Sequence, residues 1–367
     1  MKKILLGENI FLSLTLFFLP ISIGLSSLTL AFSLAYAIYT LVVNFKILNK
    51  YQKIYLGISF FFFLLIFLNS FFTDGYKLLL KYLPLMFIPI ISMPIIFDRW
   101  KKASYLRYLN YGILFSVLIS IGRYLFNDHN EFTYRTLEIL LNVHPTYYSL
   151  FLLISINHFL FGTDLIKRKN LFLLLFFIGL VVFIRSRIAL ISLVVIGFIY
   201  LLYSFKSKKA FIGVFLFLGL LTTSLFVSGT IKGKTTFKLA LTERIQIWES
   251  SYELVKEKPL LGYGIDEEFN ELGRNFLFNG KLNLLDERFN SHNIFLSILI
   301  QIGVLGLLIG LIIFIFPLIK RPLSVEFLSY LIIIGICGLT ESYIHRHWGI
   351  IIVLITGVYA VKIGVKH

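Results

Sequence analysis

Charged side chains are scarce in this chain. Only 15% of its 367 residues are Asp, Glu, Lys or Arg, whereas a soluble domain carries about 25%. Hydrophobic residues make up 58% of the chain, and the mean hydropathy is +0.86. This balance is too apolar for the surface of a soluble fold and favours a membrane protein.

Cysteine is nearly absent, and the common ligand-binding motifs are missing. The single cysteine, Cys337, excludes a disulfide within the chain, so cysteine does not report the redox compartment. His345 and His347 stand two residues apart without a matching carboxylate, which argues against a zinc site. The LLGYG sequence has too few glycines and no following lysine for a phosphate-binding loop.

Long apolar runs are abundant. A helix needs about 20 apolar residues to cross a bilayer core of ~30 Å. We predict about twelve such runs, at residues 6–24, 26–44, 54–72, 77–97, 105–126, 144–162, 169–184, 188–204, 210–228, 292–317, 323–340 and 347–364. The first run lacks a small-residue cleavage site, so we expect a helix there rather than a signal peptide. The fold class predicted is an all-α polytopic membrane protein of about 12 transmembrane helices.

Basic residues mark one side of the membrane. They gather in alternate short connections, at Lys2, Lys3, Lys46, Lys50, Lys53, Arg99, Lys101, Lys102, Arg107, Lys167, Arg168, Lys169, Lys206, Lys208, Lys209, Lys320, Arg321, Lys362 and Lys366. Short loops rich in Lys and Arg stay in the cytoplasm, so both termini are expected there. The net charge of +16 is then an orientation signal and not a sign of nucleic-acid binding.

One long polar segment, residues 229–291, falls on the opposite side. Long segments cross the membrane largely regardless of their charge, so its basic residues do not contradict the topology. We therefore expect spans one to nine in 1–228, a periplasmic helical loop in 229–291 and spans ten to twelve in 292–367. Together they would form one integral membrane domain.

Two short helices are predicted inside this loop. Thr242 is a plausible cap for a helix over 243–258, which would place Arg244 in its first turn. Apolar residues recur on this helix at helical spacing, which predicts a stripe against the membrane surface or the bundle, at Ile245, Trp248, Tyr252 and Val255. Pro259 ends the helix, Gly262 and Gly264 permit a tight turn, and a second helix is expected over 266–278.

The chain re-enters the membrane next to a histidine. We expect Asn290 or Ser291 to cap the tenth span and His292 to lie in its first turn at the outer interface. Free backbone N–H groups there attract anions. An imidazole has a pKa near physiological pH, so His292 could act as a general base, although an interfacial polar residue is the simpler interpretation.

Arginines are expected at the same outer interface as His292. Arg185 and Arg187 occupy a very short outer turn, and the planar guanidinium group suits two phosphate oxygens. Either could instead anchor a helix end on lipid phosphate. The same boundary also receives Lys81, Arg123, Arg135, Glu341, His345, Arg346 and His347, and His144 opens the sixth span as a cap or as the edge of a groove. No acidic residue interrupts the middle of a predicted span, so polar groups should concentrate at the outer face.

Two sequence blocks carry a family resemblance. The run RIQIWESSYELVKEKPLLGYG, followed after a spacer by SHNIFLSILIQIGVLGLL, resembles the signature of the O-antigen ligase and polymerase superfamily. The upstream SRIAL also matches, so the resemblance covers roughly residues 180–310. It implies a C-type glycosyltransferase fold with a large periplasmic loop between helices 9 and 10.

The resemblance also implies a reaction and a site. A metal-independent glycosyltransferase without a cofactor would take a glycan from undecaprenyl diphosphate at the periplasmic face of the inner membrane. The acceptor would be lipid A-core for a ligase or a lipid-linked glycan for a polymerase. Arg187 and Arg244 match the residues that hold the donor diphosphate, and His292 matches the residue that activates the acceptor hydroxyl. Asn293, Trp248 and Gly264 match flanking, supporting positions.

Two other classes of function are compatible with twelve spans. A transporter of lipid-linked sugar should show repeats, broken helices or mid-membrane charges. The sequence contains no clear repeat. A non-catalytic scaffold of an envelope complex would not need the set of Arg187, Arg244 and His292. We expect a ligase, with a polymerase as the first alternative.

Overall fold

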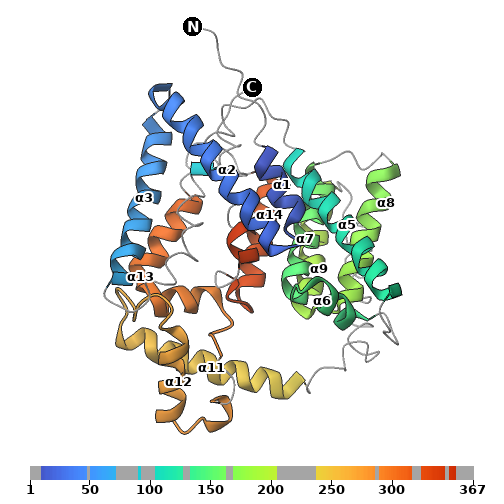
Figure 1. Cartoon of the computed structure of the whole chain (residues 1–367). Coiled ribbons are helices and arrows are strands. Elements are labelled where there is room, and N and C mark those ends of the chain that lie inside the picture. Colours follow the sequence, from blue (N-terminus) through green and yellow to red (C-terminus); the bar gives the residue numbers. More distant parts are fainter. Residues whose placement is uncertain are drawn as a thin grey trace.

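The computed structural model describes residues 10–47, 50–71, 90–91, 104–126, 133–162, 168–204, 237–285, 289–315, 324–343 and 347–352 (Figure 1). Every regular element in these ranges is a helix. The helices are α1 (Ile10–Phe18), α2 (Ile23–Asn44), η1 (Phe45–Ile47), α3 (Lys50–Phe71), α5 (Ser104–Phe126), α6 (Tyr134–Leu141), α7 (Pro145–Gly162), α8 (Arg168–Ile184), α9 (Arg187–Ser204), α11 (Phe237–Glu257), α12 (Glu268–Phe278), η2 (Leu282–Leu284), α13 (Ile294–Ile315) and α14 (Val325–Gly338).

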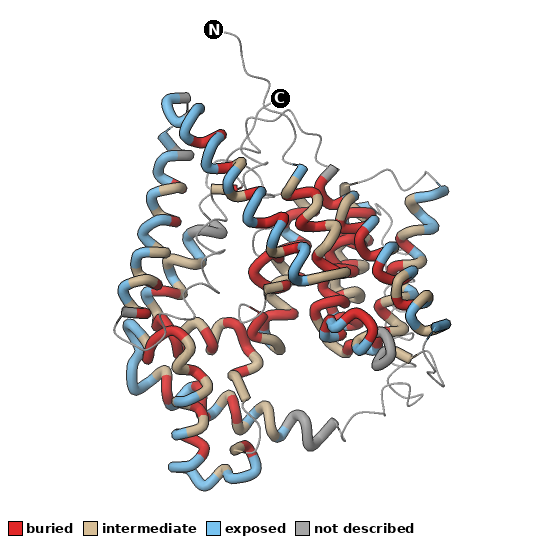
Figure 2. The backbone as a smooth tube through the Cα atoms, in the orientation of Figure 1, coloured by how far each residue is buried: buried red, intermediate tan, exposed pale blue. Residues whose placement is uncertain are grey.

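Five helical segments are long and apolar enough to cross a membrane, namely Ile23–Val43, Lys53–Ser70, Tyr105–Phe126, Arg187–Ser204 and Ile294–Ile312. Only 22% to 39% of each is buried inside the protein. Large side chains such as Phe32, Phe60 and Leu118 are therefore exposed. Exposed positions recur along the outer helices of the molecule (Figure 2). An apolar surface of this extent requires an apolar solvent. The prediction of a helical polytopic membrane protein is confirmed, while the count of twelve spans stays a prediction.

Some predicted features lie outside the described residues. They include the predicted span 210–228, the span 77–97 except for residues 90–91, and most of the span 347–364. The side chains of Lys81, Arg135, His345 and Arg346 also lie outside the described residues. Where they can be compared, α2, α3, α5, α7, α8, α9 and α14 agree with predicted spans within a few residues.

Helix α7 forms the centre of the bundle. It is buried along nearly its whole length and packs against α5, α8, α9 and α14 (Figure 2). A second, smaller core lies in the predicted loop, where Ile247 and Leu254 of α11 meet Leu272 and Phe276 of α12. The described part of the loop is therefore folded around an apolar cluster, which also includes Ile300 of α13.

The molecule has two chemically different ends. Helices α11 and α12 lie at one end, which we call the site end (Figure 1). The connection between α2 and α3 lies at the opposite end and carries the exposed residues Lys46, Lys50 and Lys53 (Figure 1). This separation is the one that the distribution of basic residues predicts.

Helix α13 is broken at Gly303, whose φ is 66°. The turn over 259–264 fills the break. Its N–H groups at Tyr263 and Gly264 donate to the carbonyls of Ile300 and Gln301, at 2.7 and 3.0 Å. The N–H groups of Val304 and Leu305 donate back to Pro259 and Leu260. Non-helical backbone is tolerated at membrane depth only when its polar groups are bonded in this way. The span predicted over 292–317 is present as α13, with a break at Gly303 that the hydropathy pattern did not indicate.

Helix α11 also departs from the prediction. It begins at Phe237, so Thr242 lies inside the helix and not at its cap, and Arg244 is not in the first turn. The face that packs inward carries Ile247 and Leu254, whereas Ile245 and Tyr252 are exposed. Of the predicted stripe, Trp248 and Val255 are partly buried, and contact of its exposed residues with the membrane surface stays a prediction. The buried face also includes the small residues Ser250 and Ser251, which a hydropathy pattern does not mark.

Candidate functional site

The segment from Phe289 to Asn293 places His292 just outside helix α13. Asn293 is the helix cap, because its Oδ1 accepts the N–H groups of Phe295 and Leu296 at 2.9 and 3.2 Å. The predicted caps, Asn290 and Ser291, are wrong, and so is the placement of His292 in the first helical turn. Asn290 instead accepts the N–H of His292 at 2.9 Å, which stabilises a turn.

His292 has a strained backbone with φ of 46°. A residue other than glycine in this left-handed region costs about 1–2 kcal/mol. Such strain often occurs at functional sites, where the surrounding structure fixes it. Here the neighbours of His292 in sequence, Ser291 and Asn293, are both buried and hydrogen-bonded.

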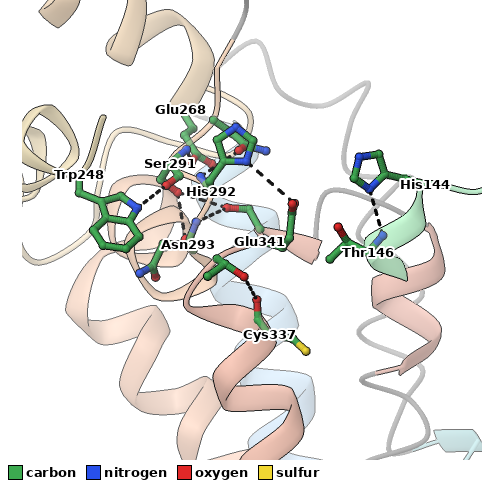
Figure 3. Close-up of polar contacts among 12 residues, drawn as sticks. His144, Thr146, Trp248, Glu268, Ser291, His292, Asn293, Cys337 and Glu341 are labelled. Atoms are coloured by element: carbon green, nitrogen blue, oxygen red, sulfur yellow. Dashed lines mark hydrogen bonds and ion pairs between the residues drawn. The ribbon is translucent and has the colours of Figure 1, made fainter. Parts of the chain in front are cut away.

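Glu341 lies beside His292. The N–H of Asn293 donates to Ser342 Oγ at 3.0 Å, and Ser291 Oγ lies 3.2 Å from the same hydroxyl. These contacts join segment 291–293 to residues 341–342 after α14. As a result, Glu341 Oε2 lies 3.9 Å from His292 Nδ1 (Figure 3). This separation is an ion-pair distance when the imidazole is protonated, and it is too long for a hydrogen bond.

Two further side chains act on Glu341. Burial works to raise the pKa of its carboxyl, but His292, His144 and Arg244 together hold this pKa below its ordinary value. Arg244 comes from α11, His144 precedes α7 and His292 precedes α13, so side chains from three other parts of the chain act electrostatically on this carboxylate. Figure 3 shows the Glu341 carboxylate between the rings of His292 and His144.

Arg187 enters from another direction as the first residue of α9. It is half-buried, and the described contacts of His292 and Glu341 do not extend to it. The position of Arg187 along the bundle axis follows from a contact between α9 and α14, in which Ser192 Oγ lies 3.8 Å from Cys337 Sγ. Arg187 is about one helical turn beyond Ser192 and Glu341 about one turn beyond Cys337, both toward the same end. The two residues therefore lie at a similar level.

The supporting positions have clear structural roles. Trp248 Nε1 donates to the carbonyl of Ser291 at 3.0 Å and so ties α11 to the His292 segment. Gly264, with φ of 126°, lies in the turn that fills the break in α13. Asn293 caps the first half of that helix. These three residues shape the backbone around His292.

A buried carboxylate adds a fourth support that the sequence did not indicate. Glu268 is fully buried at the start of α12. It accepts the N–H of Ser291 at 2.8 Å, the hydroxyl of Ser297 at 2.5 Å and the amide of Gln301 at 3.1 Å. One side chain thus connects α12 with both the His292 segment and α13. The only sequence signal was an acidic residue in a helix first turn, which is common.

This arrangement defines a class of protein. It is a polytopic helical membrane protein with a folded unit at one end, where an imidazole lies beside a carboxylate that a guanidinium group also influences electrostatically. Such a set of side chains can remove a proton from a hydroxyl and stabilise an anion.

Comparison with known proteins gives a family resemblance for part of the chain. Residues 172–311 match the family model described as O-antigen ligase, so this part of the chain is similar to proteins of the O-antigen ligase-like superfamily. Members of this family are ligases and polymerases that act on glycans, and the family implies lipid-linked glycan substrates in a membrane. No curated protein matches the chain. The matched region contains all six predicted site residues, whereas His144 and Glu341 lie outside it.

Proposed function

We propose that the protein is a glycosyltransferase that moves a glycan from undecaprenyl diphosphate to an acceptor at the periplasmic face of the inner membrane. Within this class we favour an O-antigen ligase, with lipid A-core as acceptor. The observation that carries the proposal is the approach of His292 and Glu341 at the site end, together with the electrostatic influence of Arg244 on the same carboxylate. These residues come from segments far apart in the sequence.

The chemistry assigns a role to each group. His292 takes the proton from the acceptor hydroxyl as its oxygen attacks the anomeric carbon of the donor glycan. The bond between that carbon and the diphosphate oxygen breaks, and undecaprenyl diphosphate leaves with the electron pair. Arg244 and Arg187 stabilise the negative charge on the leaving group. The carboxylate of Glu341, 3.9 Å from Nδ1, stabilises the positive charge that the ring gains when it takes the proton.

The test is transfer by purified protein in lipid vesicles, with lipid-linked glycan as donor and lipid A-core as acceptor. We expect Arg187→Ala, Arg244→Ala and His292→Ala each to reduce formation of the glycoconjugate by on the order of 100-fold or more. Protein levels should stay unchanged.

Arginines of the chain itself supply matched controls. Arg185→Ala removes a guanidinium group from the same short turn as Arg187, and Arg274→Ala removes an exposed one from α12. Both should retain transfer. Normal activity in all three site variants would reject the assignment. Movement of lipid-linked glycan across vesicles, without a new glycoconjugate, would favour a transporter.

Ligase and polymerase are distinguished by the glycans that accumulate when the gene is deleted. Loss of a ligase leaves uncapped lipid A-core and long polymer on undecaprenyl diphosphate. Loss of a polymerase leaves core bearing a single repeat. In either case we propose one integral membrane domain, with membrane-spanning helices in 1–228 and 292–367 and the 229–291 loop in the periplasm.

A further inference from the structure

A buried polar cluster lies between α7 and α14, away from the proposed site. His158 Nδ1 lies 3.0 Å from Glu326 Oε1, and the two side chains are only 3% and 2% exposed. The sequence pattern predicted that polar groups would concentrate at the outer face, so this pair was missed. Ionisable groups buried between apolar helices are costly and usually have a role.

The surroundings of the pair are built to hold it. Asn157 Nδ2 donates to the Glu326 carbonyl at 2.9 Å, and the Ser329 hydroxyl donates to Asn157 Oδ1. A glycine also makes room. A Cβ atom at Gly162 would lie 2.5 Å from His158 Nδ1 and 2.7 Å from Glu326 Oε1. Replacement of any of these residues by a larger apolar one would disturb the contact.

The same two helices meet the proposed site at their other ends. His144 directly precedes α7, and Glu341 follows α14 by three residues. His144 lies fourteen residues before His158, and Glu341 lies fifteen residues after Glu326. At 1.5 Å per helical residue, His144 to His158 spans about 21 Å, and Glu326 to the end of α14 at Gly338 spans about 18 Å, with three more residues leading to Glu341. The helices run antiparallel, so fixing His158 against Glu326 also sets His144 level with Glu341.

Apolar packing alone does not fix this register. Residues Leu150 to Ile154 of α7 are a run of similar apolar side chains, all buried. A slip of one turn would replace one such contact with another. The same slip would move Glu326 away from His158 and leave an uncompensated charge in the core, which is strongly unfavourable. A buried polar pair is a known means of fixing helix register.

We propose that the His158–Glu326 pair pins the register of α7 against α14, so that His144 and Glu341 stay opposite each other at the site end. His158 and Glu326 are then positioning residues that act through Glu341. The positioning role rests on the proposed function, whereas the register itself can be measured without it.

The first test measures distance. Spin labels at Asn142 and Leu339, both exposed at the site end, are attached in a Cys337→Ser background. The otherwise unaltered protein should give one narrow distance distribution. Glu326→Ala should broaden it or shift it by about 5.4 Å, one helical turn. The exchange of partners, His158→Glu with Glu326→His, should restore it. An unchanged narrow distribution in Glu326→Ala would overturn the register pin.

The second test measures transfer. Glu326→Ala should lower kcat at least about 10-fold with little change in KM, and Glu326→Gln provides a variant of equal size should the alanine variant fail to fold. If Glu326 acts through Glu341, then Glu326→Ala should cause no further loss of kcat in the Glu341→Gln variant. If the two single losses of kcat multiply in the double variant, the positioning role is rejected. Absence of transfer in the unaltered protein would instead reject the proposed function, and the distance test would still decide the register.

Discussion

At the scale of single residues, the site depends on how a few polar groups are held. Glu268 and Trp248 both bond to Ser291, and Ser342 bonds to Asn293, so His292 is fixed from both sides in sequence. His292 is itself only partly buried. A fixed backbone and an accessible ring are what a general base requires.

Glu341 offers a prediction at this scale. Glu341→Gln removes the charge opposite His292 while preserving size, so transfer should fall on the order of 100-fold. Glu341→Asp should retain part of the activity. The matched control is Glu249→Gln, which removes an exposed carboxylate on α11 and should leave the rate unchanged. Equal rates in both Gln variants would contradict the role of Glu341.

The pH dependence of stability follows from the same carboxyl. Its pKa is held below the ordinary value in the folded protein, so its contribution to stability is present above the pKa of the unfolded chain. That contribution is lost as the pH falls through the lower folded pKa. Thermal unfolding of the unaltered protein and of Glu341→Gln should therefore differ most near neutral pH and converge in acid. A gap that is constant with pH would contradict the ion cluster.

At the scale of elements, the broken helix α13 and the turn over 259–264 form one unit. Asn69 at the end of α3 extends it, since its Nδ2 donates to the Leu261 carbonyl and its Oδ1 accepts the Ile265 N–H, both at 3.1 Å. Broken helices are typical of transporters. In α13, the carbonyls of Ile300 and Gln301 at the break accept hydrogen bonds from N–H groups of the turn. This backbone pairing sets the direction of the first half of α13, which leads to the site.

Gly303 should be essential for this unit. A Cβ atom at Gly303 would lie 2.2 Å from the Leu260 carbonyl, and its positive φ is unfavourable for any other residue. We expect Gly303→Ala to destabilise the protein by about 3 kcal/mol or more, measured by thermal unfolding in detergent.

Gly310→Ala is the matched control in the same helix. Its Cβ would meet Phe62 at 3.8 Å, an ordinary contact, so stability should be unchanged or slightly raised. Similar stability of the two alanine variants would show that the turn does not require glycine at the break.

At the scale of the whole molecule, the two ends should face opposite sides of the membrane. Cys337 is buried, and its replacement by Ser leaves no native thiol. Single cysteines at Phe278, which is exposed near the tip of α12, and at Lys46 can then be labelled with a membrane-impermeant maleimide. We expect Phe278→Cys to react from the periplasmic side and Lys46→Cys only after permeabilisation. The reverse pattern would place the site in the cytoplasm and end the proposal.

The sequence by itself determined the class of the protein and its helical segments. Hydropathy over about 20 residues is a local property, and a helix satisfies its own backbone groups, so α2, α3, α5 and α9 could be predicted without knowledge of their neighbours. The family signature likewise pointed to His292, Arg187 and Arg244, because it lies within one continuous stretch of the chain.

Only the tertiary structure decided which groups meet. Glu341, His144, Glu268 and the His158–Glu326 pair depend on contacts between segments far apart in sequence, and no local pattern marks them. The break at Gly303 was hidden for the same reason, since the N–H groups that bond its carbonyls belong to a turn some forty residues earlier. Apolar pattern selects helices, whereas directional polar contacts between them fix register, breaks and the site.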